Sequence, residues 1–282
     1  MSSSELYKQL LLETTAYKGF NVLHNRGSDK LAIIIDPRYD EVMEAVIENF
    51  MYLMNPRGWN LMIISWSGYT SKIKARFPKC ISSSISDSHI YIDSEGNPNI
   101  SIDTYNCLLL DLEFWKCLPV EHICIFQKDC IMFKMFPEYY LCYDFCGASW
   151  HMKNTSIFNE GINGGFSLRK RSAMIDCLEY VSFETIEEYR QDALTNTSPI
   201  FKYINKDALK LPLRRNEDVF FTYACEMLRK LIPDIIQRSF LATEAIYNPD
   251  TCVYHGWQHD YHDETMAKII LCKSALFGPP GE

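Results

Sequence analysis

Apolar runs alternate with helical spacings along the first half of the chain. Leu31–Asp36 is an unbroken run of apolar residues ending in an aspartate, which is typical of a parallel strand covered on both faces. Apolar residues then recur at helical spacing from Tyr39 to Met54, and Trp59–Trp66 predicts a second strand. A strand, a helix and a strand in succession predict a parallel sheet with helical crossovers.

The alternation continues downstream, less regularly in the second half. We expect further helices and strands in this order: a helix at 70–77, a short strand at 89–93, a helix at 104–115, a strand at 121–126, and helices at 174–181 and 219–231. Loops are predicted at 154–165 and 196–216. Since neither a repeat nor a linker interrupts this order, we expect a single α/β domain over residues 1–282.

Composition and charge narrow the class of partner. With 47% apolar and 13% aromatic residues the chain can bury a large core, which excludes disorder as its main state. The formal charge of −8 would repel a polyanion, so we expect no nucleic-acid partner. A local basic cluster at Arg169–Arg171 still allows a small anionic ligand.

The sequence also predicts the cellular compartment of the protein. Its first residues do not resemble a signal peptide, and no apolar run reaches the roughly 18 residues of a membrane span. Eleven cysteines, an odd number without paired CxxC motifs, indicate reduced thiols in the core and no structural zinc. We therefore expect a cytoplasmic protein, or one of the host cytoplasm if it is viral.

Four short motifs could carry chemistry. Asp129 follows the strand at 121–126, where ligands of open α/β sheets bind, so it is either a metal ligand or the cap of a turn. The Asn163-Gly164-Gly165 turn could present backbone amides to a phosphate or a sugar, or could be a plain turn. Arg169 could bind a phosphate, or could lie exposed at a helix start.

The other two motifs are acidic and imidazole-bearing. Glu217 and Asp218 precede a predicted helix, so they are either its cap or a general base on an acceptor hydroxyl. His255 ends a late predicted strand and could complete a metal shell, with His259 and His262 close behind it. Each of these histidines could equally be a surface or packed residue.

The order of the motifs is more specific than any one of them. The stretches are Phe126–Asp129, Tyr143–Trp150, Asn163–Arg169, Asn216–Asp218 and His255–Trp257. Together they resemble a group of glycosyltransferase-like proteins of bacteria and large DNA viruses, whose motifs are FQxD, YDYxGAPW, GNGGxSLR, NEDxxF and HxxW. The resemblance covers roughly residues 31 to 257, and Arg38 matches it as well.

The resemblance implies a GT-A-like fold, a Rossmann-type, mostly parallel sheet flanked by helices. It implies a donor half at about 31–135 and an acceptor half at about 136–265. Asp129 and His255 would bind a Mn²⁺ or Mg²⁺ ion, and Asp218 or Glu217 would contact the acceptor. Trp150 and Trp257 could stack on a sugar. The residues implied at the nucleotide-sugar are Arg38, Asp129, Trp150, Asn163, Gly164, Gly165 and Arg169.

Three departures from the pattern matter. Cys146 and Ser149 replace isoleucine and proline, Ile162 replaces a glycine, and Trp257 follows His255 one residue early. Asp129 is also alone where the acidic metal motif has two aspartates, and a single carboxylate holds an ion loosely unless other groups complete its shell.

The sequence thus predicts a glycosyltransferase that moves a monosaccharide from a UDP- or GDP-sugar to a hydroxyl of a glycan or glycoprotein. Two alternatives stay open. One is a catalytically silent carbohydrate-binding protein on the same fold. The other is a sugar-nucleotide nucleotidyltransferase, which should carry a glycine-rich phosphate loop after its first strand, whereas Asp36–Asp40 contains no glycine.

Overall fold

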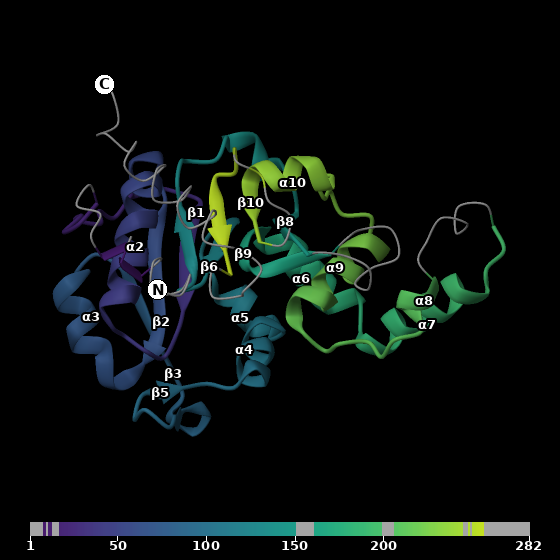
Figure 1. The fold of residues 1–282 in the computed structure, drawn as a ribbon, viewed down its shortest axis with the longest axis horizontal. Coiled ribbons are helices and arrows are strands. Elements are labelled where there is room, and N and C mark those ends of the chain that lie inside the picture. The colour runs from purple at the N-terminus through teal and green to yellow at the C-terminus, as the bar shows by residue number, and fades with distance from the viewer. Residues whose placement is uncertain are drawn as a thin grey trace.

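A six-stranded sheet forms the centre of the computed structural model, which describes residues 8–9, 11–12, 17–150, 161–198, 206–244, 248 and 250–256 (Figure 1). Four neighbouring strands are parallel: β3 (Ile81–Ile85), β2 (Asn60–Trp66), β1 (Lys30–Ile35) and β6 (His122–Phe126). Strand β9 (Ile162–Lys170) runs antiparallel to β6, and β8 (Phe145–Ser149) runs antiparallel to β9. The predicted mixed, mostly parallel α/β sheet is confirmed.

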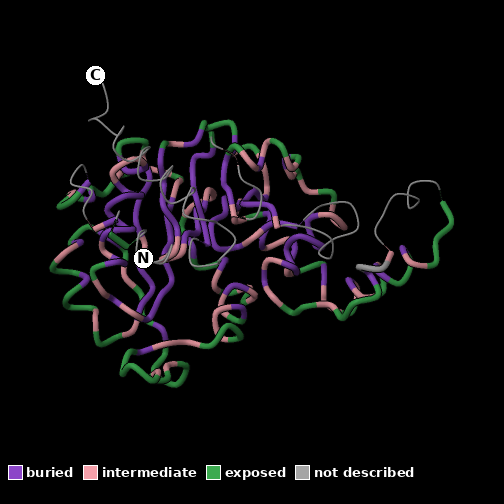
Figure 2. The backbone as a smooth tube through the Cα atoms, viewed as in Figure 1, coloured by how far each residue is buried: buried purple, intermediate pink, exposed green. Residues whose placement is uncertain are grey.

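Each face of the sheet has its own core. Alternate residues of β1 point to opposite faces, so Ile34 joins one core and Ile33 the other. Helices α2 (Glu41–Met54) and α3 (Thr70–Arg76) contribute to the first core. The second core contains residues of α4 (Ile102–Leu109), α5 (Leu112–Cys117), α6 (Arg171–Tyr180), α7 (Phe183–Thr195), α8 (Lys206–Leu209) and α9 (Glu217–Met227). Figure 2 shows the central strands as the most continuously buried part of the molecule.

A small second sheet brings the late part of the chain to the end of β6. Strand β7 (Cys130–Met132) follows β6 closely and pairs antiparallel with β11 (Val253–His255), with Cys130 opposite His255. Strand β10 (Ala242–Thr243) lies parallel to β11 on its other side, after helix α10 (Ile235–Leu241). This pairing places His255 beside the loop that carries Asp129.

Several predicted elements differ from the observed ones. The strand expected at 89–93 is only β4 (Tyr91–Ile92), which pairs with β5 (Pro98–Asn99) in a hairpin outside the main sheet. One edge of the main sheet is formed by β3, which was not predicted. Its three serines gave no apolar pattern, because an edge strand needs fewer apolar residues. The helix expected at 104–115 is two helices, because Asp111 caps α5 through the amide of Glu113.

The second half shows the larger corrections. Strand β9 begins at Ile162, within the loop expected at 154–165, and residues 154–160 of that loop lie outside the described residues. Helix α8 lies within the loop expected at 196–216, and α9 ends at Met227, short of the expected residue 231. Neither β8 nor α7 was expected.

The described residues contain no helix long and apolar enough to cross a membrane. Seven of the ten cysteines in the described ranges are buried, and none of the ten forms a disulfide. The burial agrees with the expectation that most cysteines are core residues.

Candidate functional site

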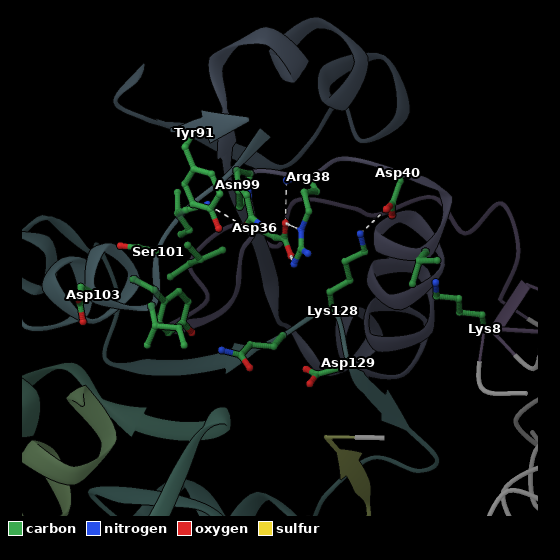
Figure 3. A pocket seen from close by; sticks show the side chains of 17 residues that line it. Lys8, Asp36, Arg38, Asp40, Tyr91, Asn99, Ser101, Asp103, Lys128 and Asp129 are labelled. Carbon is green, nitrogen blue, oxygen red and sulfur yellow. Dashed lines mark hydrogen bonds and ion pairs between the residues drawn. The ribbon is translucent and has the colours of Figure 1, made fainter. Parts of the chain in front are cut away.

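A cavity of about 920 Å³ opens where the strand order of the sheet reverses, between the carboxyl ends of β1 and β6 (Figure 3). Strands β2 and β3 extend the sheet on one side of β1, and β6 extends it on the other. Crevices at such reversal points are the usual ligand sites of open α/β sheets. The lining residues come from the ends of β1 and β6, from the β4–β5 hairpin and from the start of α4, and they include Asp36, Arg38, Asp40, Tyr91, Asn99, Asp103, Lys128 and Asp129.

Asp129 lines this cavity and contacts His255, which lies behind it. The imidazole Nε2 of His255 lies 3.4 Å from Asp129 Oδ1 and 3.3 Å from Gln127 Oε1. Burial disfavours the imidazolium, but the nearby carboxylates of Asp129 and Glu244 outweigh it and raise the pKa of His255 to about 9. Two residues that the sequence separates widely thus form one polar cluster.

The twin glycines let side chains from other elements approach β9. A side chain at Gly165 would overlap the imidazole of His255 and would lie 2.7 Å from Gln127 Oε1. A side chain at Gly164 would overlap the carboxylate of Glu217. Neither glycine has a positive φ, so the close approach of neighbouring side chains, and not the backbone conformation, requires glycine at these two positions.

Arg169 lies behind the site, among the aromatic rings of Trp115, Phe145 and Phe221. Its side chain has no exposed surface, and its guanidinium donates to both oxygens of Glu217 at 2.7 and 3.1 Å. The sequence predicts that Arg169 contacts the nucleotide-sugar, but the burial of Arg169 keeps its side chain from contacting a ligand in this conformation. Arg169 instead holds Glu217 under Gly164.

Glu217 and Asp218 are adjacent acids, and of the two Asp218 has no arginine partner in the described structure. Its Oδ2 accepts weakly from the amide of Gly164 at 3.4 Å, and its Oδ1 accepts from the amide of Val219 at 2.9 Å. Removal from water and the adjacent charge of Glu217 raise the pKa of Asp218 to about 8. A carboxyl group with such a pKa can exchange a proton near neutral pH.

Arg38 and Lys128 also line the cavity, and each lies beside a carboxylate (Figure 3). Arg38 is 42% exposed and donates to Asp36 at 2.8 and 3.0 Å, so the turn after β1 presents a guanidinium to the cavity. Lys128, which the sequence analysis did not select, forms an ion pair with Asp40. Its position between Gln127 and Asp129 was the available signal.

The donor atoms around His255 fit a hard divalent cation. One imidazole, the Asp129 carboxylate and the Gln127 amide oxygen suit Mn²⁺ or Mg²⁺ chemistry. Cys130 also lies within 4.8 Å of these ligand atoms, but its thiol donates to the Gly165 carbonyl at 3.5 Å. Burial raises the pKa of that thiol well above its usual range, so it is kept protonated.

Some predicted site residues lie elsewhere. Trp150 follows β8 and packs, partly buried, against the core that contains α9, and it is not among the residues that line the cavity. Lys170 pairs with Asp144, and Arg171 donates to the carbonyl of Trp115, so the expected basic cluster is dispersed. Trp257, His259 and His262 lie outside the described residues.

The family described as "Protein of unknown function (DUF5672)" matches residues 93–253, more than half of the chain. The matched segment includes Asp129, the twin glycines and Asp218, and it ends just before His255. No curated protein is significantly similar to the chain in sequence.

Several solved structures are similar in shape at low identity. Mouse xyloside xylosyltransferase 1 in its apo form has a TM-score of 0.47 at 11% identity, over 80% of this chain and 97% of that one. The galactosyltransferase LgtC, with donor and acceptor sugar analogues, has 0.48 at 10% identity, over 90% and 98%. The inositol-1-phosphate CTP transferase of T. maritima has 0.40 at 7% identity, over 88% and 97%. With TM-scores below 0.5, function has to be inferred from the site itself.

Substitution of Gly165 by alanine tests the close approach of His255 to β9. We expect Gly165→Ala to lower the free energy of unfolding by about 1–3 kcal/mol, because the new methyl group overlaps the imidazole. Denaturant unfolding measures the change. In a His255→Ala background the same substitution should have a much smaller effect, and an equal loss in both backgrounds would contradict the close approach.

The Arg169–Glu217 pair should show strong energetic coupling. Arg169→Met and Glu217→Gln should each destabilise the protein by about 3–5 kcal/mol, since each leaves a buried partner uncompensated. The double variant should lose clearly less than the sum of the two. The exposed Lys30–Glu138 pair provides the control cycle, with an expected coupling of about 1 kcal/mol or less. Additive losses at Arg169 and Glu217 would refute the coupling.

Asp218 should make stability depend on pH. Because its folded pKa of about 8 lies above the unfolded value of roughly 4, the folded state retains the proton, and the stability contributed by Asp218 falls as pH rises from about 4 to about 8. Asp218→Asn removes this dependence. The melting temperature of the variant relative to wild type should therefore increase across that pH range, and a constant difference would show that the pKa of Asp218 is not raised.

Proposed function

The chain belongs to the DUF5672 family of proteins of unknown function, and from its site we propose that it is a glycosyltransferase, which moves a monosaccharide from a nucleotide-diphospho-sugar to a hydroxyl acceptor. One observation carries the proposal. Asp129 at the end of β6 lines a cavity at the reversal point of the sheet and contacts His255 of β11, and that imidazole packs closely against Gly165 of β9. Such a pocket can accommodate a pyrophosphate between a metal site and exposed cations.

In this proposal the donor occupies the cavity. Arg38 and Lys128 lie on the wall where the nucleotide and its phosphates would bind, and Asp129 lies at its edge. Asn163, Gly164 and Gly165 would line the sugar side through their backbone. Arg169 serves the donor only indirectly, since it holds Glu217 in place. A UDP- or GDP-sugar fits this distribution of charge.

The divalent ion would be held by Asp129 and His255, with the Gln127 oxygen beside them. When bound, Mn²⁺ or Mg²⁺ supplies positive charge next to the leaving diphosphate. Positive charge from Arg38 and Lys128, which also line the cavity, would add to this stabilisation.

Asp218 is the proposed catalytic base, and Glu217 is its positioning neighbour. Both oxygens of Glu217 are engaged by Arg169, whereas Asp218 borders the twin glycines with a pKa of about 8. As the acceptor oxygen attacks the anomeric carbon, the bond from that carbon to the diphosphate breaks and Asp218 takes the hydroxyl proton. The donor half then spans about 31–135 and the acceptor half about 136–265, where a carbohydrate or glycoprotein would bind.

Nucleoside diphosphates should stabilise the protein more when Mn²⁺ is present. UDP or GDP at about 100 times its Kd stabilises the folded state by about 2.7 kcal/mol, which raises the melting temperature by about 5 °C. In Asp129→Ala the additional shift produced by Mn²⁺ should disappear, because the ion loses its carboxylate ligand. Thermal denaturation with each nucleotide, with and without Mn²⁺, measures both effects.

Glu113→Ala is the matched control, since Glu113 is an exposed carboxylate of α5 that does not line the cavity. An unchanged Mn²⁺ response in Asp129→Ala would remove Asp129 from the site. Stabilisation by a nucleotide-sugar without release of the nucleoside diphosphate, across a set of acceptors, would refute transfer and support a silent binding protein instead.

A further inference from the structure

The two ring nitrogens of His255 face different carboxylates. Nε2 lies 3.4 Å from Asp129 Oδ1, on the side of the cavity, whereas Nδ1 lies 3.8 Å from Glu244 Oε1. The side chain of His255 is 5% exposed, so the ring is enclosed between these two groups. No motif of the sequence pointed to Glu244.

Glu244 contacts the twin-glycine segment as well. Its Oε1 accepts from the amide nitrogen of Asn163 at 3.0 Å, and Asn163 Oδ1 accepts from the backbone amide of Gly165 at 2.6 Å. A single carboxylate oxygen therefore connects the imidazole to the strand against which that imidazole packs. The chain of contacts runs from His255 through Glu244 and Asn163 to Gly165.

The fold positions Glu244 for this role. Strand β10 pairs parallel with β11, with Thr243 opposite Tyr254, so the next residue along each strand is Glu244 and His255 respectively. Because Gly165 has no side chain, the ring of His255 can lie directly against β9. The backbone of β9 thus bounds one face of the ring. The buried Nδ1 has no hydrogen-bond partner in the described structure and faces the Glu244 carboxylate at 3.8 Å, which makes that carboxylate a group that can accept a proton from Nδ1.

We propose that Glu244 is a positioning residue that holds Nδ1 of His255 as the protonated nitrogen, so that the lone pair of Nε2 is directed at a divalent ion shared with Asp129. Histidines that bind metals commonly donate their other N–H to a carboxylate, which fixes the tautomer and the orientation of the ring. Glu244 is not itself a ligand of that ion, because it lies on the opposite edge of the ring from Asp129. The inference rests on the metal site of the proposed function.

Binding of Mn²⁺ to the full chain, without nucleotide, tests this role directly. Glu244→Ala should raise the Kd for Mn²⁺ about 10- to 100-fold, the usual effect of removing such an outer partner. Glu244→Gln retains an oxygen that can accept from Nδ1 and should raise the Kd less. Glu138→Gln, at an exposed carboxylate that does not line the cavity, should leave the Kd unchanged. Isothermal titration calorimetry measures all four proteins.

A second measurement separates positioning from a general loss of structure. In protein labelled with ¹⁵N-histidine and loaded with diamagnetic Zn²⁺, long-range ¹H–¹⁵N spectra show which ring nitrogen is bound. The wild type should show Nε2 bound and Nδ1 protonated, and Glu244→Ala should show a mixture of both nitrogens bound.

The outcomes are distinct. Mn²⁺ binding by wild type with a Kd within twofold in Glu244→Ala would overturn the role of Glu244 and leave the metal site intact. An unchanged tautomer in Glu244→Gln and Glu244→Ala would overturn it as well, even with a lower melting temperature. Absence of any Mn²⁺ binding by the wild-type protein would overturn the metal site together with this inference, whereas nucleotide binding without metal would leave the donor site standing.

Discussion

Strand β9 can pass close to Glu217 and His255 only because residues 164 and 165 have no side chains. A methyl group at either position would occupy the space of the carboxylate or of the imidazole. Three elements that are remote in sequence therefore share one small volume: the loop after β6, the start of α9 and the end of β11. The polar cluster at the cavity edge exists because of this packing requirement, and its chemistry follows from which groups are brought together.

The same contact separates two adjacent acids into different roles. The carboxylate of Glu217 pairs with the fully buried guanidinium of Arg169, which compensates its charge and donates to both of its oxygens. Asp218, one residue later, accepts hydrogen bonds from the backbone amides of Gly164 and Val219. The charge held on Glu217 also disfavours ionisation of Asp218. The buried ion pair thus influences the protonation of Asp218, although burial keeps the pair itself from contacting a ligand.

The parallel half of the sheet could be predicted because its strands are buried on both faces and read as unbroken apolar runs, as Leu31–Ile35 does. Strand β3 could not, since its serines lie at an edge. Strand β9 was hidden by its glycines, which indicate a turn unless the approaching side chains are known. Asp129 and His255 could be found by their positions at strand ends, but Glu244 follows a two-residue strand and acquires its role only through pairing with β11.

In the proposed function, a metal site whose acidic ligand is Asp129 alone can still favour a diphosphate. Gln127 stands where a second carboxylate would add negative charge, and its neutral amide lies 3.3 Å from His255 instead. The loss of that charge weakens the hold on a free ion but also weakens the repulsion of an incoming anion. Arg38 pairs with Asp36 and Lys128 pairs with Asp40, so both cations of the cavity are in place before a ligand arrives. A ligand that brings its own phosphate oxygens can therefore complete the shell of the ion and contact preformed cations at once, whereas a neutral sugar gains neither interaction.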